Sequence, residues 1–160
     1  MGIVSLSDLA DYVNNNPGEL TFGTDAEFGN RPDGLPGVEE TYGFEFGDDN
    51  IAEMTYGLQY EALYNGEVDV AMGFETDSRI REYELVNLED PEDFFPSYNA
   101  AVSMTAETHE QYPEIEEHLQ PLMEQLDSEV MRELNYQVDV EEKSVDEVAQ
   151  TYLEENGFLE

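Results

Sequence analysis

The chain has 160 residues, with 40 Asp and Glu against 5 Lys and Arg, and a formal net charge of −35 at pH 7. This length suits one domain with a buried core, and the shortage of cationic side chains makes nucleic acid and anionic membranes poor partners. The absence of cysteine excludes a disulfide framework, a thiol nucleophile and a cysteine-type zinc site.

The acidity has more than one interpretation. High net charge is typical of disordered chains, but 39% hydrophobic and 11% aromatic residues, spread along the sequence, favour a folded body. A self-repelling surface that needs counterions is typical of proteins from high-salt organisms, with an acidic mesophilic domain as the alternative. We therefore expect a halophilic folded protein whose carboxylates associate with sodium or calcium without a specific site.

Helix and strand signals alternate in the first two thirds of the sequence. Apolar residues recur at helical spacing between capping residues and turns, and short apolar runs bounded by turns are typical of buried strands. These signals predict strands over 20–23, 44–46, 51–54 and 68–74, and helices over 6–13, 36–42 and 57–64, with a helical turn after 24 and a short helix capped by Thr76 or Asp77. Such alternation indicates an α/β sheet with mostly parallel strands.

The pattern from Thr105 onward is helical. It predicts helices over 105–111, 113–126 and 129–135, an extended piece over 136–140, and a last helix from the capping box at Ser144. Pro121 predicts a kink or break in the second of these helices. We divide the chain into an α/β lobe, residues 3–103, and a helical C-terminal segment, residues 104–160. No apolar run approaches the ~20 residues of a membrane span, and the first four residues lack the features of a signal peptide.

Several motifs occur in an order that resembles a known family. They are FGTDAEFGNRPDGLPGVEETYG, LQYEALYNGEVDVAMGF, GFETDSRI, LVNLEDPEDFFPSYNAA and MRELNYQVDVEEKSVDEVAQTYLEENG. With them the chain resembles the substrate-binding proteins of osmoprotectant ABC importers, the group for glycine betaine, choline and carnitine. The resemblance implies a periplasmic-binding-protein type II-like lobe with a mixed, mostly parallel sheet flanked by helices. It also implies that the C-terminal segment returns to a first lobe whose N-terminal part is missing here.

Arg31 is the first candidate for ligand binding. It is one of few cations and stands in a loop, where it could simply pair with Asp25 or Asp33. Its alternative role is to grip a carboxylate in two parallel hydrogen bonds, which arginine does better than lysine. The resemblance implies this second role, because an arginine of the family's EF-x-x-R-x-D-G loop contacts the carboxylate of betaine-type ligands.

Phe74 and Tyr98 are the aromatic candidates. Both stand where strand-like runs end, which is where open sheets hold ligands, although packing is the commoner role of such rings. The resemblance implies an aromatic cage for a quaternary ammonium group, with Phe74 in place of the usual tyrosine and therefore without its hydroxyl. Weaker candidates are Asp25, Thr76 and Asp77. The tyrosines at 56, 60 and 64 form a helical stripe that we interpret as amphipathic packing.

The sequence gives little support to an enzyme. Close acidic pairs arise by chance among 40 carboxylates, and no nucleophile-elbow, P-loop or dinucleotide-binding motif is present. His109 and His118 are more typical of solvated surface than of a metal site, and no cofactor is implied.

We therefore expect a non-enzymatic solute-binding component, or a fragment of one, for an osmoprotectant such as glycine betaine or choline. Its partners would be this small ligand and an ABC transporter permease, with self-association through the C-terminal helices. The family places it at the extracellular or periplasmic face of the membrane. The alternative is a truncated halophilic α/β interaction module that binds no ligand of its own.

Overall fold

The computed structural model describes residues 2–159, which fall into two compact units. The first unit comprises the residues up to Phe74 together with Tyr83–Pro96, and the second comprises Glu75–Glu82 together with the residues from Ser97 on. Residues 75–82 therefore belong to the second unit, although the segments before and after them belong to the first. No helix within the described residues is long and apolar enough to cross a membrane. The division at residues 103 and 104 that the sequence suggests stays a prediction.

A three-stranded sheet lies at the centre of the first unit. Its strands are β1 (Phe22–Thr24), β2 (Ile51–Glu53) and β3 (Val70–Ala71), in the order β2-β1-β3. Both pairings are parallel, with Phe22 opposite Ile51 on one side and Val70 on the other. The central strand is buried throughout, as expected for a strand with a neighbour on each side and helices over its faces. The α/β class with a parallel sheet is confirmed, and no antiparallel strand pairs with β1–β3 in the described part of the chain.

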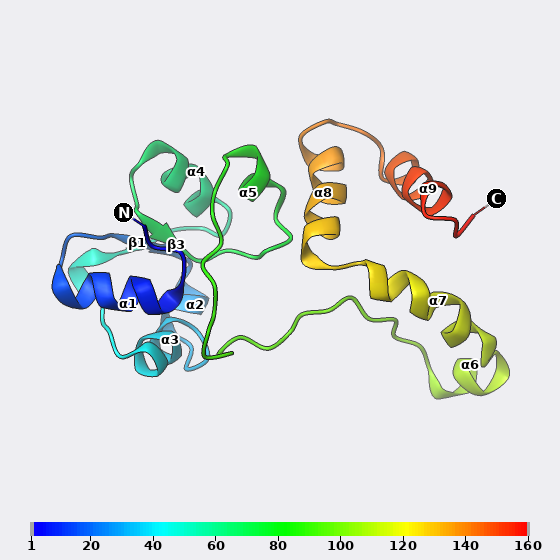
Figure 1. Ribbon diagram of the computed structural model, residues 1–160, viewed down its shortest axis with the longest axis horizontal. Coiled ribbons are helices and arrows are strands. Elements are labelled where there is room, and N and C mark those ends of the chain that lie inside the picture. The colour runs from blue at the N-terminus through cyan, green and yellow to red at the C-terminus, as the bar shows by residue number, and fades with distance from the viewer. Residues whose placement is uncertain (1, 160) are drawn as a thin grey trace. The chain divides into compact units, whose positions relative to one another are not determined.

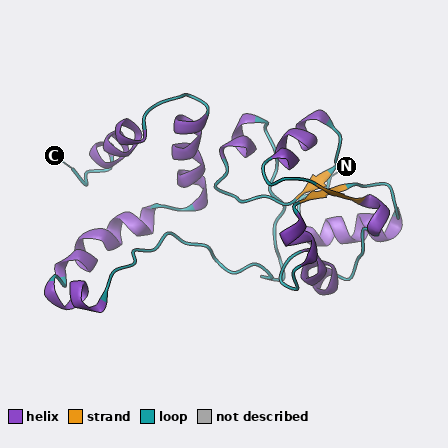
Figure 2. Ribbon diagram, turned by 180° about the vertical axis from the view of Figure 1, so that it is seen from behind, coloured by secondary structure: helices purple, strands orange, loops and turns teal. Residues whose placement is uncertain are grey.

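The helices of this unit are α1 (Leu6–Asn15), α2 (Ala26–Asn30), α3 (Leu35–Tyr42) and α4 (Leu58–Asn65), with a 3-10 turn η1 (Asp48–Asn50) before β2. Figures 1 and 2 show α4 on one side of the sheet and α1 and α3 on the other. The core between them is made of buried apolar side chains, namely Leu9, Ala10, Val13, Leu20, Phe22, Phe28, Leu35, Val38, Phe44 and Phe46.

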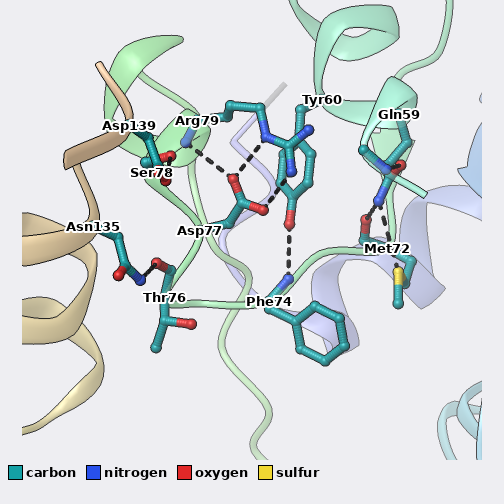
Figure 3. Close-up of polar contacts among 11 residues, drawn as sticks. Gln59, Tyr60, Met72, Phe74, Thr76, Asp77, Ser78, Arg79, Asn135 and Asp139 are labelled. Atoms are coloured by element: carbon teal, nitrogen blue, oxygen red, sulfur yellow. Dashed lines mark hydrogen bonds and ion pairs between the residues drawn. The ribbon is translucent and has the colours of Figure 1, made fainter. Parts of the chain in front are cut away.

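The second unit is helical. It contains α5 (Ser78–Glu82), α6 (Ala106–Gln111), α7 (Glu114–Gln125), α8 (Ser128–Asp139) and α9 (Val145–Glu155). The insert 75–82 packs on α8, and α8 also contacts α9. Figure 3 shows the polar side of the first contact, in which Asn135 Nδ2 donates to the Thr76 carbonyl (2.8 Å) and Ser78 Oγ donates to Asp139 Oδ2 (2.8 Å).

Two element predictions are wrong in a way that tertiary contacts explain. Residues 44–46 form no strand, because two of their N–H groups donate to Glu39. The Phe44 N–H donates to the Glu39 carbonyl, and the Phe46 N–H donates to Glu39 Oε1. The two rings are nevertheless buried, and Phe46 stacks on Phe22 at 5.1 Å between centroids. The predicted extended piece 136–140 is instead the end of α8, where Tyr136 lies 4.0 Å beneath the Arg81 guanidinium of α5.

Pro121 does not break its helix. α7 runs without interruption from Glu114 to Gln125 with the proline inside it. Proline removes one intrahelical hydrogen bond, to the carbonyl of Glu117. Because Glu117 is exposed, that carbonyl can bond to water, which reduces the cost of keeping the helix continuous.

Candidate ligand-binding site

The carboxyl ends of the three parallel strands meet at one edge of the sheet. There β1 leads to Asp25, β2 leads to Tyr56, and β3 leads to Phe74. Open parallel sheets hold their ligands outside this edge, because the loops that follow the strands converge there. Two of these three positions, 56 and 74, carry exposed aromatic rings.

Three rings form a cluster at this edge. The ring of Tyr56 meets that of Phe74 edge to face, with centroids 5.6 Å apart, and meets that of Tyr60 in the same manner at 6.3 Å. Tyr60 is 2% exposed, whereas Tyr56 is 41% and Phe74 51% exposed. The cluster is therefore anchored by one buried ring and presents two rings to solvent.

Tyr60 also fixes the backbone at Phe74. Its hydroxyl accepts a hydrogen bond from the Phe74 N–H at 2.9 Å, as Figure 3 shows. The structure therefore places the predicted residue Phe74 beside Tyr56, which the sequence did not single out. The available signal was the position of Tyr56 just after a strand, which indicates a ligand-facing edge; its place in the tyrosine stripe suggested packing instead.

Arg31 follows α2 and is held by acidic neighbours. Its Nη1 donates to Glu27 Oε1 at 3.2 Å. Its Nε lies 3.1 Å from Asp33 Oδ1, at an angle that makes this an ion pair and not a hydrogen bond. The guanidinium carbon also lies 5.9 Å from the Phe28 ring centroid. The expected pairing with Asp33 is thus present, and among the described residues the guanidinium makes no hydrogen bond, ion pair or ring contact with Phe74.

Asp25, Thr76 and Asp77 use their polar groups within the chain. Asp25 caps α2, since its Oδ1 accepts the Phe28 N–H at 2.8 Å. Asp77 accepts the Arg79 N–H at 3.1 Å and forms a two-pronged pair with the Arg79 guanidinium, at 2.8 and 2.7 Å (Figure 3). The carbonyl of Thr76 accepts from Asn135. These contacts give each residue a structural role.

Tyr98 belongs to the second unit and lies in the extended stretch before α6. Its side chain is 72% exposed and makes no hydrogen bond or ring contact within residues 2–159. Its phenol ring is therefore accessible. Its part in a ligand site remains a prediction.

The loop that leads toward Tyr98 is anchored in the first unit. The Tyr42 hydroxyl donates to Asp90 Oδ1 and accepts the Glu92 N–H at 3.1 Å, while Asp90 Oδ2 accepts the Phe95 N–H at 2.8 Å. Burial and the hydrogen bond to Asp90 raise the pKa of Tyr42 to about 12. Tyr42 therefore stays protonated and can keep donating to Asp90 at physiological pH.

Among the described residues, no three His, Cys, Asp or Glu side chains are grouped to hold a metal ion. The cluster at the sheet edge offers the exposed ring faces of Tyr56 and Phe74. A parallel α/β unit with accessible rings at the carboxyl edge of its sheet has the architecture of an open-sheet lobe.

Comparison with known proteins identifies the family. Residues 1–155 match the family described as the substrate binding domain of ABC-type glycine betaine transport system (OpuAC), so the chain belongs to this family. Its members are solute-binding transport components and not enzymes, which confirms the expected class.

Individual relatives agree with this assignment. The chain is 37% identical over its whole length to a glycine-betaine-binding protein of Pseudomonas aeruginosa, covering 53% of that protein. It is 38% identical over 98% of its length to the carnitine transport binding protein OpuCC of Listeria monocytogenes, covering 49% of it. The chain thus spans about half the length of these relatives.

Two solved structures share the fold. A glycine betaine/carnitine/choline ABC transporter structure matches 98% of the chain with a TM-score of 0.84 and 35% identity, and the chain covers 55% of it. Apo YehZ from Escherichia coli matches the same share with a TM-score of 0.78 and 30% identity, and the chain covers 57% of it. The sequence-based prediction of a periplasmic-binding-protein lobe is confirmed.

Proposed function

We propose that this chain is the ligand-binding lobe of a solute-binding protein that holds a quaternary ammonium osmoprotectant, such as glycine betaine or choline, for an ABC importer permease. It would act at the periplasmic or extracellular face of the membrane. The observation that carries the proposal is the pair of exposed rings, Tyr56 and Phe74, at the carboxyl edge of the parallel sheet.

Ring faces are the natural partners of such a ligand. A quaternary ammonium group has no N–H to donate, so a protein holds it by shape and by cation–π attraction, worth about 0.5–2 kcal/mol per ring. Phe74 retains the negative ring face but has no hydroxyl, so Tyr56 is the polar ring of this pair.

Arg31 is the proposed partner of a ligand carboxylate. Its present partners, Glu27 and Asp33, have side chains that are each 80% exposed, and exposed ion pairs of this kind contribute only about 0–1 kcal/mol. A ligand carboxylate can therefore replace one of them at small cost and gain two parallel hydrogen bonds. Tyr98, whose side chain is exposed, remains a further candidate ring for the ligand.

Calorimetry in molar KCl tests the proposal with glycine betaine, carnitine, choline and proline. We expect the three quaternary compounds to bind and proline to bind more weakly. Phe74→Ala, Tyr56→Ala and Tyr98→Ala should each weaken all three by about 3- to 30-fold, the loss expected for one ring. Arg31→Ala should weaken glycine betaine and carnitine but spare choline, because choline has no carboxylate.

Tyr112→Ala is the matched control, since Tyr112 is an exposed tyrosine, 46% accessible, beside α6. Equal affinities of all variants would reject these site residues. Failure of the unaltered chain to bind any of the compounds would favour the interaction-module alternative.

Self-association is the second part of the proposal. α6, α7 and α8 bury no residue, and the apolar positions of α7, Ile115, Leu119 and Leu122, are only half-buried. Partly exposed apolar stripes favour association, here with a second copy of the chain. Light scattering in molar KCl should show a mass above 18.2 kDa, and a strict monomer would contradict this part.

A further inference from the structure

Two neighbouring polar side chains at the start of α4 are buried almost completely. Gln59 is 0% exposed and Tyr60 is 2% exposed. Burying polar groups costs free energy unless each finds a hydrogen-bond partner, so their partners indicate what the pair does. In both residues the partner is main chain near the ends of β2 or β3, next to the exposed rings.

Gln59 joins the segments that follow two different strands. Its Oε1 accepts the N–H of Gly57, directly after Tyr56, at 2.6 Å. Its Nε2 donates to the carbonyl of Met72, two residues before Phe74, at 3.2 Å (Figure 3). One planar amide therefore fixes the distance between the backbone that carries the first exposed ring and the backbone that carries the second.

Tyr60 makes the second connection. Its hydroxyl accepts the Phe74 N–H at 2.9 Å, and its ring meets the Tyr56 ring edge to face. Its approach to the chain is so close that a Cβ added at Gly73 would lie 3.0 Å from Tyr60 Oη and 3.1 Å from its Cε1. A side chain at position 73 would therefore push the phenol away by a few tenths of an ångström, whereas glycine lets it approach the Phe74 amide freely.

We infer that Gln59 and Tyr60 are positioning residues that set the spacing and tilt of the Tyr56 and Phe74 rings and thereby the selectivity for the fully methylated ammonium group. This inference rests on the proposed function. A leucine and a phenylalanine would fill the same space without polar atoms to satisfy, but they would not fix the backbone at 57, 72 and 74. Cation–π attraction depends on the distance and direction of the ring face. Small shifts of the two rings therefore change the affinity for a trimethylammonium group relative to a less methylated one.

Tyr60→Phe is the sharpest variant, because it removes only the hydroxyl and keeps the buried ring. Gln59→Glu is the companion, since it keeps an acceptor for Gly57 but replaces the donor to Met72 with an oxygen. Tyr64→Phe is the matched control, a tyrosine of the same helix that is 65% exposed and stacks on Tyr83 at 4.8 Å.

The first measurement needs no ligand. Amide hydrogen exchange at Phe74, followed by NMR in molar KCl, should become at least about tenfold faster in Tyr60→Phe, the change expected when one hydrogen bond of about 1.4 kcal/mol is lost. It should stay unchanged in Tyr64→Phe. Unchanged exchange in Tyr60→Phe would overturn the inference.

The second measurement is the ratio of affinities for glycine betaine and for dimethylglycine, which lacks one methyl group. We expect Tyr60→Phe and Gln59→Glu to reduce this ratio by about 3- to 10-fold, while Tyr64→Phe leaves it unchanged. A purely structural role would weaken both ligands equally, and an unchanged ratio would therefore overturn the inference while the proposed function stands. If the unaltered chain bound neither ligand, the proposed function would fail and the selectivity claim with it.

Discussion

The two units of this protein are stabilised in different ways. Among the described residues, thirteen of the buried hydrophobic side chains lie in the first unit, and only Ile80 and Val148 lie in the second. The first unit therefore has a core from which the edge of its sheet can present rigid rings. The second unit consists of amphipathic helices whose apolar faces are only partly covered.

Polar contacts connect α8 with the 75–82 insert in the second unit. α8 reaches the main chain of the 75–82 insert through Arg132, which donates to the Glu75 carbonyl at 2.9 Å, and through Asn135, which donates to the Thr76 carbonyl. Arg81 forms an ion pair with Glu133. Hydrogen bonds contribute about 1 kcal/mol each, less than a fully buried leucine, so the difference between the units has measurable consequences.

The largest expected effect is the loss of a core side chain. Leu9 is 2% exposed in the core of the first unit, so Leu9→Ala should lower the free energy of unfolding by about 2–5 kcal/mol. Leu122 of α7 is only half-buried, and Leu122→Ala should cost about 1 kcal/mol or less. Urea unfolding of both variants in molar KCl measures the difference. Equal losses would contradict the contrast between the units.

A serine caps one helix in each unit, so the same substitution can be compared in both. Ser5 Oγ accepts the Asp8 N–H at 3.1 Å in a capping box on α1, and Ser144 Oγ accepts the Glu147 N–H at 3.2 Å on α9. Replacement of either by alanine should cost about 1 kcal/mol. We expect Ser5→Ala to destabilise the first unit as a whole, because α1 contributes to its core, and Ser144→Ala to speed hydrogen exchange within α9 alone.

Ser128→Ala is the control for this pair, since Ser128 is the first residue of α8 and Asp127 is its cap. Uniform exchange effects across both units after Ser144→Ala would argue that the second unit is as cooperative as the first.

Loss of a polar contact in the second unit should lower the free energy of unfolding about as much as loss of a helix cap, or less. Asn135→Ala removes the donor to the Thr76 carbonyl and should cost about 0.5–1.5 kcal/mol. Hydrogen exchange should rise in α8 and in residues 78–82, while the amides of β1 keep their protection. Asn156→Ala is the control, because Asn156 donates only to the Tyr152 carbonyl of its own helix. Loss of protection in β1 would contradict the assignment of this contact to the second unit.

The smallest effect concerns pH. Burial raises the pKa of Glu39 above its ordinary value of 4.5, although the Phe46 N–H that donates to its Oε1 opposes the shift. Folding therefore favours the protonated form, so the stability that Glu39 contributes is present below pH 4.5 and is lost as the pH rises through the raised pKa. Glu39→Gln should flatten the decline of stability above pH 4.5, measured by thermal unfolding, while Glu40→Gln at the exposed neighbour should not. Parallel pH profiles for Glu39→Gln and the unaltered chain would contradict this.

Local signals predicted most elements of the first unit. The caps and turns around 6–13, 36–42 and 57–64 correspond to α1, α3 and α4. The runs at 51–54 and 68–74 contain β2 and β3, and the run at 20–23 overlaps β1. Two predictions failed because partners outside the segment itself decided its conformation. Glu39 accepts the hydrogen bonds of the Phe44 and Phe46 N–H groups, which a strand at 44–46 would need for pairing. The Arg81 guanidinium lies over the Tyr136 ring in the stretch expected to be extended.

The candidate site was only partly visible in the sequence. Phe74 stood out because it ends a strand-like run, and the structure places it at the carboxyl edge of the sheet. Tyr56 did not, because its spacing with Tyr60 and Tyr64 is that of an ordinary helical stripe. Only the folded chain shows that Tyr56 lies outside α4 and meets Phe74.

By itself the sequence determined the α/β class, the helical C-terminal part, the absence of thiol chemistry and the motifs that resemble betaine-binding proteins. These properties follow from composition and from short-range periodicity, which neighbouring residues settle among themselves. The tertiary structure decided which rings meet at the sheet edge and how Gln59 and Tyr60 connect the segments that follow two strands. Such contacts join residues far apart in the chain, and their geometry exists only once the parallel strands have brought their carboxyl ends together.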